Sequence, residues 1–296
     1  ISMPSDKQWT LGRLLTWTTD YLRQHGSESP QLDAQLLLAH ACSCRRIELF
    51  TAYHEVASEA QRSQFRELVR QRAAGMPVAY LTGAREFYSL EFHVTPAVLI
   101  PRPETEFVVV ALLDAIKAQG GRAAPPVIAD VGTGSGVLAV CAARHVPECR
   151  VWATDLSAAA VAVATENCQR HGVLDRVTLC PGDLLEPVPA DVRFDFVLSN
   201  PPYVSEPEYA QLPRDVRDYE PRQALLAGPT GAEVIERLVP QAADRLRYGG
   251  RLLLEISPMI ERAVHQIIAR DGRFEPATTT PDLAGHPRVV QAVIRS

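Results

Sequence analysis

Residues 194–203 read FDFVLSNPPY, and this stretch decides the predicted fold. Its first six residues form an apolar run with aromatic and β-branched side chains, which is typical of a buried β-strand. Two consecutive prolines cannot extend a sheet, because neither has a backbone N–H group to donate. The strand is therefore expected to end at Asn200. Ligands of open α/β sheets bind beyond the carboxyl ends of the strands, so we expect the reaction site there.

The residues at this strand end suit a reaction at a planar nitrogen. The side-chain oxygen of Asn200 and the backbone oxygen of Pro201 can accept the two hydrogens of an –NH2 group. Tyr203 offers a flat face for the rest of the group. An amide nitrogen is a poor nucleophile because its lone pair is delocalised, so holding both hydrogens helps to aim it at an electrophile. The alternative is a turn that only ends a strand.

A glycine-rich turn marks a second strand end. Residues 127–131 are predicted to form a strand and residues 137–144 an apolar helix. The expected cofactor-binding residues between them are Gly132, Thr133, Gly134, Ser135 and Gly136. Glycines here let a ligand approach the backbone and expose N–H groups at the helix amino end. The spacing from Gly134 to Ala139 also fits a dinucleotide fingerprint, so the glycines alone leave the cofactor open.

Acidic residues at two further strand ends complete a predicted adenosine site. Asp155 ends the strand predicted over residues 151–155, about 20 residues after the glycines, where a carboxylate accepts both hydroxyls of a ribose. Asp183 follows a strand over residues 177–180 and can accept a hydrogen bond from an adenine amino group, with Leu184 against the ring. In the alternative, Asp183 only caps a turn. Either adenosine cofactor fits these residues.

The chain divides into three predicted parts. From residue 104 to residue 296, strands alternate with helices, which indicates a doubly wound α/β sheet. Further predicted elements there are helices at 232–247 and 259–270 and strands at 252–256 and 288–294. Residues 79–103 are expected to form a linking β-hairpin, because strand-like alternation is followed by a segment that prolines keep extended.

Residues 1–78 are predicted to form a small helical domain, because apolar residues recur at helical spacing and no strand pattern occurs. Ser58 and Gln61 resemble a capping box at the start of one helix. Six arginines make the domain locally basic, namely Arg45, Arg46, Arg62, Arg66, Arg70 and Arg72. They indicate either a surface for a partner or solvated helix faces.

Composition limits the function classes. The chain has 296 residues, 46% of them hydrophobic, and a formal net charge of -5, which gives no general basic surface for nucleic acid. No apolar run approaches the roughly 20 residues that span a bilayer, and residues 1–4 do not resemble a secretory signal. We expect a cytoplasmic monomer without membrane or nucleic-acid contacts. The six cysteines and eight histidines lack metal-ligand spacing, so no metal is expected.

Taken together, the motifs resemble those of class I S-adenosylmethionine-dependent methyltransferases that act on a planar nitrogen. The residues that carry this resemblance are 130–136, Asp155, Asp183 and 200–203. Other segments resemble the peptide chain release factor glutamine methyltransferases, the PrmC or HemK family: residues 87–92, 99–106, 219–221 with 224–225, and 282–285 with 288–289. One departure is Ser257-Pro258, where this family usually has glycine.

The resemblance implies a Rossmann-like, seven-stranded methyltransferase domain at 104–296 and a substrate-recognition role for residues 1–78. It further implies methyl transfer from S-adenosylmethionine, without a metal, to N5 of the glutamine in the Gly-Gly-Gln motif of class 1 release factors. S-adenosylhomocysteine is the product. Asn200, Pro201 and Tyr203 are the expected catalytic residues, Asn200 also contacts the cofactor, and Pro202, Arg102 and Glu104 join them in binding substrate.

Two rival functions fit parts of this pattern. An adenine-N6 nucleic-acid methyltransferase shares residues 200–203, here called the NPPY corner, but needs a phosphate-binding surface and a pocket for a flipped base. A cofactor-binding regulator of translation needs no catalysis at all. The intact Asn200 and glycines favour an enzyme.

Overall fold

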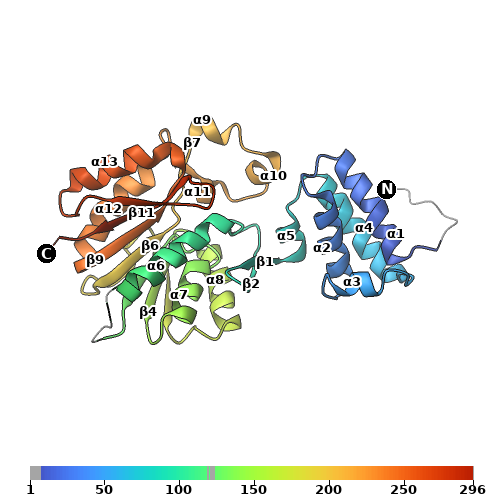
Figure 1. Cartoon of the computed structure of the whole chain (residues 1–296), viewed down its shortest axis with the longest axis horizontal. Coiled ribbons are helices and arrows are strands. Elements are labelled where there is room, and N and C mark those ends of the chain that lie inside the picture. The colour runs from blue at the N-terminus through green and yellow to red at the C-terminus, as the bar shows by residue number, and fades with distance from the viewer. Residues whose placement is uncertain (1–7, 119, 121–123, 296) are drawn as a thin grey trace. The chain divides into compact units, whose positions relative to one another are not determined.

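A computed structural model describes residues 8–118, 120 and 124–295 of the chain (Figure 1). The predicted absence of a secretory signal concerns residues 1–4, which lie outside these ranges. The chain forms two compact units. One unit comprises Ile1–Ala84 and Arg214–Tyr219, and the other comprises Arg85–Pro213 and Glu220–Ser296.

The first unit is helical. Its helices are α1 (Leu11–Gln24), α2 (Pro30–Ala41), α3 (Glu48–Thr51), α4 (Glu59–Ala73), α5 (Val78–Thr82) and α10 (Arg214–Arg217). The capping box at α4 is confirmed, because Ser58 N donates to Gln61 Oε1 at 2.8 Å and Gln61 N donates to Ser58 Oγ at 3.2 Å. Apolar side chains from α1, α2 and α4, including Leu14, Leu37 and Phe65, form its core. The helical domain expected from hydrophobic periodicity is thus present, with residues 214–219 added from a distant part of the chain.

The second unit contains a seven-stranded sheet in the order β10-β11-β9-β6-β3-β4-β5, which confirms the predicted fold class. The strands are β3 (Val127–Val131), β4 (Arg150–Asp155), β5 (Val177–Pro181), β6 (Phe194–Ser199), β9 (Leu246–Glu255), β10 (Thr278–Pro281) and β11 (Pro287–Val293). β6 runs parallel to β3 and β9, whereas β11 is antiparallel to both of its neighbours. The carboxyl ends of β3, β4 and β6 therefore meet at one edge.

Helices cover both faces of this sheet (Figure 1). The longer ones are α6 (Glu106–Ala118), α7 (Val137–His145), α8 (Ala158–Arg170), α12 (Glu233–Arg245) and α13 (Glu261–Asp271). Short elements are η1 (Pro103–Thr105), β7 (Val204–Ser205), α9 (Glu206–Tyr209), α11 (Arg222–Leu225), β8 (Leu226–Gly228) and η2 (Pro258–Ile260). Within β9, Leu253 joins the core beneath α6, α7 and α8, whereas Leu252 and Leu254 join the core beneath α12 and α13. The alternation of side chains along a strand thus divides the core into two layers.

Two strands differ from the sequence-based prediction. Strand β9 begins at Leu246 rather than at residue 252, because Gly249 N and Gly250 O pair with Ile294 instead of forming an open turn. Edge strand β10 was not predicted, since its sequence, TTTP, is largely exposed and lacks apolar alternation. No helix of the described residues is both long and apolar enough to cross a membrane.

The predicted hairpin consists of β1 (Ala84–Phe87) and β2 (Leu90–His93) and is shorter than residues 79–103. Its two turn residues, Tyr88 and Ser89, have positive φ angles, as the primed turns of tight hairpins require. Residues 78–82 form α5 instead, which ends at the left-handed Gly83.

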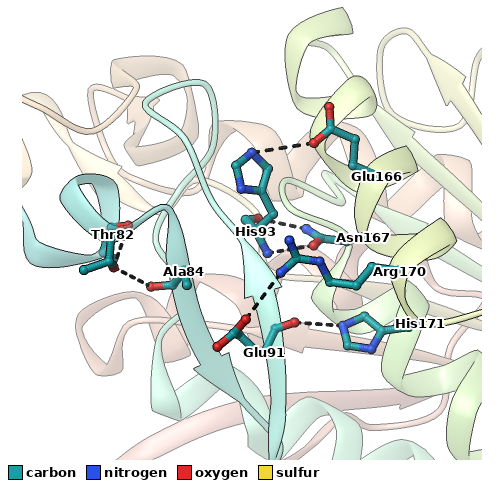
Figure 2. A network of polar contacts seen from close by, with 9 residues as sticks. Thr82, Ala84, Glu91, His93, Glu166, Asn167, Arg170 and His171 are labelled. Atoms are coloured by element: carbon teal, nitrogen blue, oxygen red, sulfur yellow. Dashed lines mark hydrogen bonds and ion pairs between the residues drawn. The ribbon is translucent and has the colours of Figure 1, made fainter. Parts of the chain in front are cut away.

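Buried Asn167 of α8 is hydrogen-bonded to β2 (Figure 2) and also to the glycine-rich turn. Its Oδ1 accepts from His93 N at 2.7 Å, and its Nδ2 donates to His93 O at 2.9 Å and to Ser135 O at 2.8 Å. Figure 2 also shows His171 Nε2 against Glu91 O at 2.9 Å. One side-chain amide therefore connects the hairpin, α8 and the loop after β3.

Asn167→Leu should lower the free energy of unfolding by about 1–3 kcal/mol, because it removes the hydrogen bonds that the buried Asn167 amide makes with the backbone of His93 and Ser135. Urea unfolding followed by circular dichroism measures this loss. Gln169→Leu on the exposed face of the same helix is the matched control and should change stability little. Equal stability of the two variants would contradict the bridging role.

Candidate active site

A pocket lies at the carboxyl edge of β3, β4 and β6. Most of the predicted site residues line it: Gly132, Thr133, Gly134, Ser135, Asp155, Asp183, Leu184, Asn200, Pro201 and Pro202. Gly136, Tyr203, Arg102 and Glu104 are not among its lining residues. The sheet topology thus brings together residues that are up to 70 positions apart in the chain, from 132 to 202.

Asn200 presents its acceptor end to this pocket. Its Nδ2 donates to Thr105 Oγ1 at 3.0 Å, whereas none of the described residues donates to its Oδ1. The backbone oxygen of Pro201, in the part of the chain that the structure describes, likewise has no donor. Two acceptors on adjacent residues therefore remain available, and their contact with an –NH2 group stays a prediction.

Tyr203 turns its hydroxyl away from solvent. The hydroxyl donates to Glu255 Oε1 at 3.4 Å, and the ring packs against the core beneath α12 and α13. Burial, followed by the nearby Glu255 charge, raises the pKa of Tyr203 well above its ordinary value. The phenol therefore stays protonated and can donate, while its contact with substrate remains a prediction.

Asp155 organises the glycine-rich turn. Its Oδ2 accepts from Gly134 N and its Oδ1 from Ser157 N, both at 2.9 Å. Burial raises the pKa of Asp155, and the two backbone hydrogen bonds oppose that shift. Gly136 contributes to packing instead. A Cβ atom at this position would lie 3.2 Å from Ala164 Cβ, so the absence of a side chain allows the turn to approach α8 closely.

Asp130 is a site residue that the motif analysis did not assign. Its Oδ2 accepts from Thr133 Oγ1 at 2.6 Å and from Ala139 N at 3.0 Å, and its buried Oδ1 has no partner among the described residues. Burial raises the pKa of Asp130 to about 7, against the effect of these two hydrogen bonds. An acidic residue inside the apolar run VIADV is the signal that could have found it. Such an oxygen suits a cationic ligand group.

Asp183 has a partner that its sequence neighbourhood does not reveal. Arg237 of α12 forms an ion pair with Asp183 Oδ2, and both residues line the pocket. Leu184 next to it has a φ of 48°, an uncommon left-handed conformation for a residue with a side chain. In this backbone conformation Leu184 lines the pocket.

The loop before α6 is held by a buried acid. Glu220, which is 5% exposed, accepts from Ile100 N at 3.1 Å and from Arg102 Nη2 at 2.6 Å. Arg102 is therefore engaged within the protein, and its predicted contact with substrate, like that of Glu104, stays a prediction. Pro101 and Thr105 of the same loop do line the pocket.

No group of three or more His, Cys, Asp or Glu side chains within the described ranges is arranged to hold a metal ion.

The chain matches two family models. One describes a PrmC N-terminal domain and covers residues 13–83, and the other describes a methyltransferase small domain and covers residues 109–212. A release factor glutamine methyltransferase of Rhodopirellula baltica is 47% identical over 286 residues, which cover 97% of this chain and 97% of the relative. A protein of the same name from Moorella thermoacetica is 42% identical over 286 residues, with 97% and 99% covered.

Solved structures provide a similarity of fold. The T. thermophilus 16S rRNA N2 G1207 methyltransferase, in complex with AdoMet and guanosine, gives a TM-score of 0.53 at 21% identity. The match covers 72% of this chain and 50% of that chain. At this identity it supports the shared architecture only.

Asp130→Asn should stabilise the ligand-free protein more at pH 8 than at pH 5. Since folding raises the pKa of Asp130 from 3.8 to about 7, the protonated carboxyl contributes stability below pH 3.8 that is lost as the pH rises through about 7. Asparagine stays neutral and can still accept both hydrogen bonds. We expect its gain in the free energy of unfolding to be about 1–3 kcal/mol larger at pH 8.

Urea titrations at the two pH values measure this difference. The matched control is Asp175→Asn, at an exposed position of the same unit. A gain that is independent of pH would show that Asp130 is charged at both values.

Proposed function

Because this chain belongs to the release factor glutamine methyltransferase family, we propose that it methylates a glutamine side-chain amide in class 1 peptide chain release factors. The methyl donor is S-adenosylmethionine and the product S-adenosylhomocysteine. The acceptor is N5 of the glutamine in the Gly-Gly-Gln motif, and its methylation modulates translation termination. The family resemblance of the motifs is confirmed by relatives that span nearly the whole chain.

The orientation of Asn200 is the observation that carries this proposal. Its nitrogen is occupied by Thr105, so its oxygen and the backbone oxygen of Pro201 are the acceptors available for the two hydrogens of a substrate amide. An apolar substrate would leave both acceptors without partners, and a hydroxyl group, with its single hydrogen, would leave one. An unpaired acceptor is costly where water is excluded.

Three carboxylates fit the donor molecule. Asp130 offers its unpartnered Oδ1 to the amino group of the methionine part. Asp155, between the glycine-rich turn and Ser157, accepts from the ribose hydroxyls, and Asp183 accepts from the adenine amino group with Leu184 against the ring. When bound, S-adenosylmethionine supplies a methyl group that its sulfonium already makes electrophilic.

The residues of the corner act mainly through orientation. Asn200 Oδ1 and Pro201 O hold the amide hydrogens, which aims the nitrogen, and alignment of this kind is worth roughly 7–11 kcal/mol in well-oriented reactions. Their hydrogen bonds strengthen as positive charge develops on the nitrogen, so they stabilise the transition state more than the ground state. The extra proton leaves afterwards, because an N-alkylated, protonated amide is strongly acidic.

We assign substrate recognition to the helical unit. Arg45, Arg62 and Arg70 each pair with a glutamate three residues away, so they offer little free positive charge. The unit also exposes apolar side chains, with Ile47 at 63% and Phe50 at 50% exposed. A protein substrate suits this mixture better than nucleic acid. The adenine-N6 alternative shares the NPPY corner, but the relatives do not favour it.

Labelled S-adenosylmethionine offered with intact release factor or with an oligonucleotide tests the proposal. Mass spectrometry should locate the label on the glutamine amide of the Gly-Gly-Gln motif. Asn200→Ala should lower the transfer rate about 10²-fold or more, because it removes one preorganised polar contact, while cofactor affinity changes less. Gln169→Ala on α8 is the control. Label in the oligonucleotide alone, or full activity of Asn200→Ala, would refute the proposal.

Asp155→Ala should weaken S-adenosylmethionine binding about 10-fold or more, because a partly buried carboxylate that accepts charge-assisted hydrogen bonds is lost. Isothermal titration calorimetry measures the Kd, and Asp175→Ala serves as the exposed control. An unchanged Kd would remove Asp155 from the cofactor site.

A further inference from the structure

A buried carboxylate without an assigned role lies beside Asn200. Glu255 is the last residue of β9 and is 0% exposed. Ser199 of β6 pairs with Leu254 of β9, so Asn200 and Glu255 follow as neighbours on adjacent parallel strands. A fully buried carboxylate costs stability unless it is hydrogen-bonded, which requires an explanation for this one.

Thr105 connects Glu255 to Asn200. The Thr105 hydroxyl hydrogen-bonds to Glu255, and its Oγ1 accepts from Asn200 Nδ2 at 3.0 Å. A hydroxyl group has one hydrogen, and an ionised carboxylate only accepts. The Thr105 hydrogen therefore belongs to Glu255, and Thr105 can only accept from the asparagine. This direction of the hydrogen bonds leaves Asn200 Oδ1 for the pocket.

Glu255 also contacts the tyrosine of the NPPY corner directly, because the Tyr203 hydroxyl donates to Glu255 Oε1 at 3.4 Å. Two residues of the corner, Asn200 through Thr105 and Tyr203 directly, thus depend on the same carboxylate. Glu255 Oε2, by contrast, has no hydrogen-bond partner among the described residues.

The charges around Glu255 come from several elements. Arg288 on β11 favours the ionised form, and Glu104 on η1 opposes it. Arg288 is held in turn by Asp282, with 3.0 Å between Nη2 and Oδ2, and it also donates to Ile256 O at 3.5 Å. Arg288, held in place by Asp282, thereby supplies a positive charge close to Glu255.

We propose that Glu255 and Thr105 are positioning residues for the transfer, because the carboxylate, through the threonine hydroxyl, sets which end of the Asn200 amide faces the substrate. This inference rests on the proposed function, since Asn200 is the group that holds the substrate amide. Neither Glu255 nor Thr105 needs to touch the reacting atoms. Tyr203 is positioned by the same carboxylate.

Protonation of Glu255 should remove the constraint that keeps Asn200 Oδ1 facing the substrate. Burial raises the pKa of Glu255 to about 7, against the opposing effects of the Thr105 hydrogen bond and Arg288. Below that pH the carboxyl can donate to Thr105, whose hydrogen is then free to turn to Asn200 Oδ1. The amide can rotate and present its nitrogen to the substrate. The methyl-transfer rate at saturating cofactor should therefore fall as the pH drops through about 7. Titration of Asp130, by contrast, should change the affinity for the cofactor.

Thr105→Val and Thr105→Ser form the decisive pair. Valine has the shape of threonine without the hydroxyl, so it should lower kcat about 10-fold or more, whereas KM for release factor and Kd for S-adenosylmethionine change little. Serine retains the hydroxyl and should restore kcat. Wild-type kcat in Thr105→Val overturns the proposal. So does an equal loss of kcat in Thr105→Ser, or a loss of kcat that is matched by weaker S-adenosylmethionine binding, because either result indicates a structural role.

A second readout does not require activity. The chain contains two asparagines, Asn167 and Asn200, so selective 15N-asparagine labelling yields two side-chain NH2 signals, with Asn167 as an internal reference. The Asn200 signal should shift as the pH passes through about 7, and Glu255→Gln and Thr105→Val should each abolish that shift. A shift that persists in both variants refutes the inference. Failure of the wild type to methylate release factor would refute the proposed function instead.

Discussion

The hydrogen bond from Asn200 Nδ2 to Thr105 is the interaction on which the site depends. The two ends of an asparagine amide are similar in size and opposite in hydrogen-bonding character, so packing alone cannot choose between them. Because Thr105 accepts from the nitrogen, the oxygen is left to receive a hydrogen from a ligand. The parallel neighbours β3 and β9 hold the backbone of β6 on both sides, which places this amide at a rigid strand end.

Three carboxylates, two of them buried and one partly buried, lie at the same edge of the sheet. Asp130, Asp155 and Glu255 stand at or near the carboxyl ends of β3, β4 and β9, and burial raises the pKa of each. Desolvated acids lower folding stability, and such groups cluster where a protein binds or transforms a ligand. The site is therefore an acceptor-rich surface within an apolar sheet, suited to a cationic donor molecule and to an amide that brings hydrogens.

The fold could be predicted well where strands are buried on both faces. Strand β3 occupies the predicted residues and β4 starts one residue earlier, because continuous apolar runs mark them without ambiguity. The sequence-based predictions that were wrong concern the antiparallel end of the sheet. Strand β10 consists of three threonines, two of them half-buried, and a proline, and β9 extends through two glycines because Ile294 pairs with them. Neither feature leaves a hydrophobic pattern in the chain.

The sequence by itself determined where the strands end and which residues stand there, because those positions follow from local chemistry. Proline cannot donate to a sheet, and glycine tolerates the positive φ angles of the turn after β3. Only the tertiary structure decided the partners of these residues. Thr105 is 95 positions from Asn200, Glu220 is 118 from Arg102 and Arg237 is 54 from Asp183. Which side-chain atom is occupied and which remains for a ligand depends on such distant pairings, which exist only once the sheet has assembled.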